Sequence, residues 1–131
     1  MIVLDSHIWF WWINLEHDRL SPRLLEKIDN AEQIGVSAVS CFELALAHSR
    51  GRLSLPLSPS AWFACALEGS HVEMLPLTRN IAVRAVALTS IHRDPFNRII
   101  IATALEYDGM LVSMDSQFGD YPELKGRLVH S

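Results

Sequence analysis

The sequence predicts an α/β fold, a three-layer α/β/α sandwich around a mainly parallel central sheet of four to five strands. Short apolar segments with the composition of strands alternate with helical segments along the whole chain. The strand segments are apolar without alternation, which is typical of parallel strands covered on both faces. The length of 131 residues and the absence of an internal repeat favour a single domain over residues 1–131.

Strands are expected wherever a short apolar run meets turn residues or an acid. The first, Ile2–Leu4, ends directly at Asp5, and a later one ends near Asp115. The remaining segments repeat this length and apolar character. We expect strands at residues 2–4, 34–37, 72–75 and 110–113, and an edge strand at 128–130.

Helices are expected where a capping residue precedes an apolar run. Ser6 is interpreted as the N-cap of a helix to Asn14, and Ser21 with Pro22 starts the next helix. Ser40 is interpreted as a third N-cap, and Glu43 stands three residues later, at capping-box spacing. The other expected helices cover residues 60–68, 78–88 and 94–107.

Composition excludes several classes of protein. The net charge of −4 argues against a protein that coats nucleic acid through bulk positive charge. The longest apolar runs are far shorter than the ~20 residues of a membrane span, and the N-terminus does not have the pattern of a signal peptide. Cys41 and Cys65 are expected to be buried free thiols, and no histidine spacing indicates zinc.

Four acids are expected to converge at one edge of the sheet. Asp5 and Asp115 follow strands, and Glu43 and Asp94 lie in the first turns of helices. The carboxyl ends of parallel strands form the usual binding crevice of such folds. Clustered carboxylates repel one another, and Mg²⁺ or Mn²⁺ removes that penalty and assists phosphodiester hydrolysis.

Each acid also has a structural explanation. Asp94 before Pro95 is a typical N-cap, Glu43 completes a capping box with Ser40, and Asp115 before Ser116 suits a capped turn. Asp5 is the hardest to explain by structure alone, because a buried apolar strand rarely ends in an acid. A phosphoacceptor receiver domain is disfavoured, because Asp5 has no acidic neighbour.

Four segments of the chain resemble those of PIN-domain toxins of the VapC type. They occur in the family's order and spacing, from residue 1 to about residue 120. The segments are Ile2-Val-Leu-Asp5-Ser-His-Ile-Trp9, Ser37-Ala-Val-Ser-Cys-Phe-Glu43 with Gly51-Arg-Leu53, Arg93-Asp-Pro-Phe-Asn-Arg98 and Leu111-Val-Ser-Met-Asp115.

The resemblance implies a PIN-like fold and a cytoplasmic endoribonuclease that depends on Mg²⁺ or Mn²⁺. It implies that Asp5, Glu43 and Asp115 hold the metal, with Ser6 and Ser113 supporting them. It also implies RNA as the substrate, a cognate antitoxin protein that neutralises the enzyme, and a homodimer as the common assembly. No association with a membrane is expected.

One departure from the family pattern concerns the third segment, where the family has an aspartate at the position of Asn97. An amide offers one neutral oxygen, so the affinity for a hard cation should fall. Asp94, three residues earlier, is the expected substitute as a catalytic and metal-binding residue. Two hypotheses remain: a nuclease that relies on Asp94, or a weakened PIN-like module that acts mainly by binding its antitoxin or RNA.

Arginines flank the second and third segments and are candidates for phosphate contacts. They are Arg50, Arg52, Arg93 and Arg98. Arg98 and Arg52 are the preferred two, because a guanidinium group binds phosphate in a bidentate manner. The structural alternative is that these arginines are solvated or neutralise a helix end.

Overall fold

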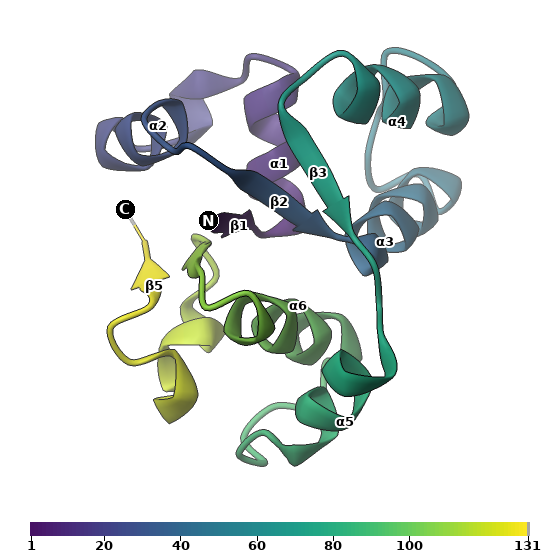
Figure 1. Cartoon of the computed structure of the whole chain (residues 1–131). Coiled ribbons are helices and arrows are strands. Elements are labelled where there is room, and N and C mark those ends of the chain that lie inside the picture. The colour runs from purple at the N-terminus through teal and green to yellow at the C-terminus, as the bar shows by residue number, and fades with distance from the viewer. Residues whose placement is uncertain (131) are drawn as a thin grey trace.

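The computed structural model describes residues 1–130 and has one central sheet of five strands (Figure 1). The strand order is β3-β2-β1-β4-β5, and every neighbouring pair is parallel. The expected mainly parallel α/β sheet is confirmed. The strands are β1 (Ile2–Leu4), β2 (Ile34–Ser37), β3 (Val72–Leu75), β4 (Met110–Val112) and β5 (Leu128–Val129).

Six α-helices and three short 3₁₀ segments connect the strands of residues 1–130. The α-helices are α1 (Ser6–Ile13), α2 (Pro22–Asp29), α3 (Ala38–Ser49), α4 (Pro59–Glu68), α5 (Arg79–Ala87) and α6 (Pro95–Glu106). The 3₁₀ segments are η1 (His17–Arg19), η2 (Ser116–Asp120) and η3 (Pro122–Leu124). None of these helices is long and apolar enough to cross a membrane.

Helices cover both faces of the sheet, and an apolar core lies against each face. In Figure 1, α1, α2 and α4 lie on one side of the strands and α5 and α6 on the other. Leu4 and Val112, which are register partners, pack into the first core, whereas Val3 and Leu111 face the second. Period-two alternation therefore divides apolar strands between two buried faces.

β1 lies in the middle of the sheet, between β2 and β4. Because all strands are parallel, the segments after β1, β2 and β4 leave the sheet at the same edge. Asp5 follows β1, Ser37 ends β2, and Ser113 follows β4. The topology thus gathers polar side chains that are far apart in the sequence.

Two of the expected helix caps are wrong. α1 is capped by Asp5, whose carboxylate accepts the Ser6 N–H, so Ser6 lies inside the helix. α3 is capped by Ser37, whose hydroxyl accepts from Val39 N–H, so Ser40 is not an N-cap. The capping box between Ser40 and Glu43 is therefore excluded, and both side chains are available for other contacts.

The two cysteines are free, as expected, but neither of them is fully buried, so the expectation of buried thiols is wrong. Cys41 is half-buried and Cys65 is exposed. The aromatic run of α1 packs mainly inside the molecule: Trp9 and Phe10 are buried, and Trp11 and Trp12 pack partly against the same core.

Candidate active site

Asp5 is a buried carboxylate at the carboxyl end of the central strand. Its side chain is held on both oxygens: Ser6 N–H donates to Oδ1 at 2.8 Å and Ser113 Oγ donates to Oδ2 at 2.8 Å. Only 8% of the residue is exposed. Burial raises the pKa of Asp5 to about 6, and the nearby Glu43 carboxylate adds to this effect, while hydrogen bonds from Ser113 and Ser6 oppose it.

Glu43 is hydrogen-bonded to Ser6, the residue that follows Asp5. We call the hydrogen-bonded set of Ser40, Ser6 and Glu43 the serine relay. The Ser6 hydroxyl lies 2.6 Å from Glu43 Oε1 and 2.8 Å from Ser40 Oγ. A hydroxyl has one proton and a carboxylate only accepts, so Ser6 donates to Glu43 and accepts from Ser40. Both serines are fully buried, and the relay fixes Glu43 on α3 against the start of α1.

Asp115 lies on the other side of Asp5 and is linked to it through Ser113. The Asp115 N–H donates to Ser113 Oγ at 3.0 Å, and that hydroxyl donates to Asp5. Asp115 also caps η2, because its Oδ1 accepts from Gln117 N–H at 2.9 Å. The interpretation of Asp115 as a cap is therefore correct for Oδ1. The side chain is exposed, so Oδ2 remains available for a ligand.

Asp94 caps α6, as its position before a proline predicts. Its Oδ1 accepts from Phe96 N–H at 2.9 Å and from Asn97 N–H at 3.3 Å. Asn97 is buried, with 6% of the residue exposed. The start of α6 borders the site through Phe96, which lines a pocket together with Glu43.

Two small pockets adjoin at the acids and share His7. The first, of about 220 Å³, is lined by Asp5, His7, Ile8, Trp11, Met114 and Asp115. The second, of about 240 Å³, is lined by His7, Glu43, Leu44, Leu46, Ala47, Arg50, Arg52 and Phe96. Asp5, Glu43 and Asp115 thus come together around the first turn of α1, from three different elements.

The donor set fits a hard divalent cation held partly through water. Within residues 1–130, no three His, Cys, Asp or Glu side chains lie close enough to hold one ion directly. Mg²⁺ commonly takes one or two carboxylates and keeps several waters, so a direct triad is not required. Burial disfavours the charged form of the Asp5 carboxylate and raises its pKa. A nearby cation would stabilise that charged form.

Arg98 points its guanidinium group into the backbone between α5 and α6. It donates to five carbonyl groups, at distances of 2.8 to 3.3 Å. These carbonyls belong to Ala85, Val86, Leu88, Thr89 and His92. The donors of Arg98 are therefore used within the fold, which argues against the expected role of this residue as a phosphate ligand.

Sequence reasoning missed two residues that line these pockets and one that holds Ser6. His7 lines both pockets, Phe96 lines the second, and Ser40 orients the relay. A signal existed for His7, which stands two residues after Asp5 on the same helix start. No sequence signal indicated that Ser40 contacts Ser6, because 34 positions separate them.

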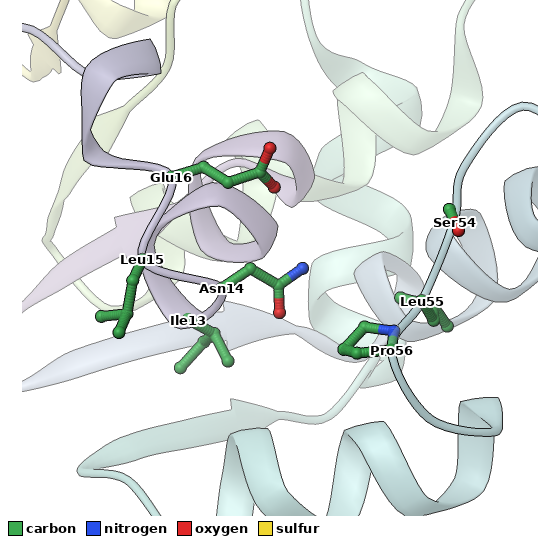
Figure 2. Close-up of a pocket in the computed structure, with 7 residues that line it drawn as sticks. All are labelled: Ile13, Asn14, Leu15, Glu16, Ser54, Leu55 and Pro56. Carbon is green, nitrogen blue, oxygen red and sulfur yellow. The ribbon is translucent and has the colours of Figure 1, made fainter.

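A pocket of about 470 Å³ lies elsewhere, and Asp5, Glu43 and Asp115 do not line it. Figure 2 shows that it is formed by the end of α1 with the following turn, including Asn14 and Glu16, and by residues 54–56. Asn14 accepts a hydrogen bond from Trp62 Nε1, and Glu16 pairs with Arg19. We therefore place the candidate active site at Asp5.

A family model described as "PIN domain" matches residues 2–124 of the chain. Ribonuclease VapC22 of Mycobacterium tuberculosis is 37% identical over 115 residues, which cover 87% of this chain and 86% of that protein. The four segments that carry the candidate site all lie within the matched range.

Solved structures with the same fold are toxin–antitoxin complexes. VapBC2 of Rickettsia felis, bound to a promoter DNA fragment, superposes with a TM-score of 0.71 at 18% identity, covering 99% of this chain and 98% of that one. DNA-bound VapBC of Salmonella typhimurium gives a TM-score of 0.70 at 17% identity, covering 98% and 96%. At these identities the likeness establishes the fold.

Proposed function

The chain belongs to the PIN-domain family, and we propose that it is the ribonuclease toxin of a VapC-type toxin–antitoxin system, hydrolysing RNA with Mg²⁺ or Mn²⁺. The observation that carries the proposal is the buried Asp5 carboxylate, flanked by Glu43 through Ser6 and by Asp115 through Ser113. The identity to a VapC ribonuclease over most of the chain supports the same conclusion.

In this mechanism the chain's own groups provide the binding and orientation. Asp5, Glu43 and Asp115 would hold the cation, which supplies an activated water and neutralises charge on the phosphate when bound. Ser6 and Ser113 keep two carboxylates oriented by donating to them. Asp94 and Asn97 lie at the start of α6 and would complete the site from its rim, as a carboxylate and an amide oxygen.

The test is cleavage of RNA by the purified protein with Mg²⁺ or Mn²⁺. We expect cleavage that EDTA abolishes, and a loss of at least about 100-fold in the Asp5→Asn variant. The change removes one charge from a side chain of nearly the same shape, so the fold should be retained. Circular dichroism and thermal melting check that retention.

The matched control is Asp29→Asn, which makes the same substitution at the exposed end of α2. This variant should cut RNA as fast as the unmodified chain. Undiminished cleavage by Asp5→Asn would contradict the assignment of Asp5, whereas no cleavage by any form would contradict the nuclease proposal itself.

The partner we propose is a small antitoxin, as in the complexes that share this fold. A second copy of the chain is the other proposed partner, since Val83 and Val86 of α5 are 69% and 82% exposed and apolar surface of this kind is often covered by association. Acting on RNA inside a cell, the protein would work in the cytoplasm. Growth arrest on expression, relieved by Asp5→Asn, tests the toxin role.

The alternative is a weakened module that mainly binds its partner, and Asn97 is the observation that favours it. Asn97, an amide where the family pattern has an aspartate, is buried in the first turn of α6. The effect of Mg²⁺ on thermal stability and on cleavage, compared between the unmodified chain and Asn97→Asp, distinguishes the nuclease from the weakened module.

A further inference from the structure

We propose that the pocket between α3 and α6 is a nucleotide subsite, in which Arg50 and Arg52 bind the backbone phosphate of single-stranded RNA and Phe96 stacks on a base. This rests on the proposed function and adds where the RNA lies. The pocket of about 240 Å³ combines these three residues with His7 and Glu43, so it continues directly from the candidate active site.

The arginines are fixed by the way in which α3 ends. Gly51 has a φ of +72°, which glycine adopts without strain, and its N–H donates to His48 O at 3.0 Å. The next N–H, that of Arg52, donates to Ala47 O at 2.9 Å. These two bonds form the Schellman motif, which turns the chain sharply so that Arg50 and Arg52 line one pocket.

Both guanidinium groups are available for a ligand. Neither Arg50 nor Arg52 forms an ion pair within residues 1–130, although Arg19, Arg84 and Arg127 do. A helix C-terminus favours positive charge, but that effect alone does not require both side chains to line the same pocket. Planar guanidinium groups match phosphate oxygens, so the charge here suits a polyanion.

The distance from the acids assigns the subsite to a neighbouring nucleotide. Arg50 is the C-cap of α3, seven positions after Glu43, which is about 10 Å along the helix axis. A phosphate held at Arg50 therefore lies toward the end of the pocket opposite Glu43, although both side chains line it. The substrate must pass from one pocket to the other past His7, which lines both.

Phe96 supplies the surface for a base. It is half-buried at the start of α6, and its ring contacts that of Phe42 at a centroid distance of 5.6 Å. Aromatic rings beside basic groups bind single-stranded RNA because every base has a face that can stack. A continuous duplex would keep its bases paired and inaccessible to this ring, so the substrate class is unpaired RNA.

Binding measured without cleavage tests this subsite. The non-cleaving Asp5→Asn protein is titrated into a fluorescein-labelled RNA of about 12 nucleotides with randomised sequence. Fluorescence anisotropy is followed in Mg²⁺ buffer from about 50 to about 200 mM salt. We expect Arg50→Gln and Arg52→Gln each to weaken binding about five- to tenfold and to reduce the salt slope by about 0.7. Phe96→Leu should weaken binding about tenfold with an unchanged slope, and Phe96→Tyr should restore it.

Matched controls are Arg23→Gln, at an exposed position of α2, and Tyr107→Leu, at the opposite end of α6; both should bind RNA as before. Unchanged affinity in the Arg50, Arg52 and Phe96 variants overturns the subsite, even if the unmodified protein cuts RNA. The subsite is also overturned if these variants lose only antitoxin binding, which would make the pocket a protein-binding site. Failure of the nuclease proposal is separate, because it appears as absent cleavage by the unmodified protein.

Discussion

Asp5 is stabilised by its neighbours and destabilised by its burial. It caps α1, accepts two hydrogen bonds and still has a pKa near 6, because the surrounding protein removes water from its charge. The residue that we propose as a cation ligand is therefore one that the fold would hold more stably without charge. The Asp5→Asn variant should therefore lose activity without losing stability.

The pH dependence of unfolding tests this conflict. The pKa of Asp5 is 3.8 in the unfolded chain, its ordinary value, and about 6 in the folded chain. Between these two pH values the folded chain keeps the Asp5 proton and the unfolded chain releases it. The unfolding free energy therefore falls as the pH rises. Relative to Asp5→Asn, the unmodified protein should lose about 2 kcal/mol of unfolding free energy between pH 4 and pH 7. Urea unfolding in EDTA measures the difference, and parallel pH profiles of the two proteins would contradict it.

The sequence could predict which acids lie near one another but not how they are held. Asp5 and Asp115 follow from strand ends, and Glu43 from its helix after β2. The contacts of Ser6 with Glu43 and of Ser113 with Asp5 join residues 37 and 108 positions apart, and no local pattern encodes them. Ser37 and Ser40 are chemically equal as caps, so only the end of β2 decides between them.

At the scale of the element, Arg98 connects α5 to α6. The last carbonyls of α5 have no partner within their helix, and one guanidinium group satisfies them together with the loop that leads to Asp94. A residue that sequence reasoning assigned to phosphate thus holds the start of α6, which carries Phe96 and Asn97. Sequence alone shows a charge but not the carbonyls that surround it.

Arg98→Met should therefore reduce the unfolding free energy by about 2–4 kcal/mol, since it leaves five carbonyls without that donor. The matched control, Arg84→Met on α5, removes a partly exposed pair with Glu106 at 3.6 Å and should cost less than about 1 kcal/mol. Urea unfolding compares the two. Equal losses would show that Arg98 does not connect the helices as described.

At the scale of the whole molecule, binding of a cation should stabilise the fold. A ligand that binds only the folded form adds about 2.7 kcal/mol at 100 times its dissociation constant. Asn97→Asp adds a charge at a buried position, so it should lower the melting temperature in EDTA and increase the upward shift that Mg²⁺ causes. If it also increases cleavage, the amide weakens the natural site.

Thermal melting with and without Mg²⁺ measures these shifts. The control is Asn80→Asp, the same substitution at an exposed position of α5, which should not change the response to Mg²⁺. An identical response in Asn97→Asp and the unmodified chain would contradict the idea that position 97 affects the cation.

The fold class, the strand positions and most helices follow from composition and from the alternation of strand and helix segments along the chain. Burial on both faces makes each strand a short, uninterrupted apolar run, which is easy to identify. The strand order does not follow from these patterns, since β1 pairs with both β2 and β4 and the sequence contains no sign of which strand is central. Right-handed crossovers limit the possibilities, but the final order depends on packing between distant helices.

The central position of β1 has a consequence for the synthesis of the chain on the ribosome. Asp5 is made before its hydroxyl partner Ser113, which follows 108 positions later, and β4 must pair beside β1 before they can meet. The growing polypeptide therefore carries the acid without the site, and a chain terminated before residue 113 would lack one side of it. The hydrogen bonds that hold Asp5 are complete only after β4 and Ser113 have been made.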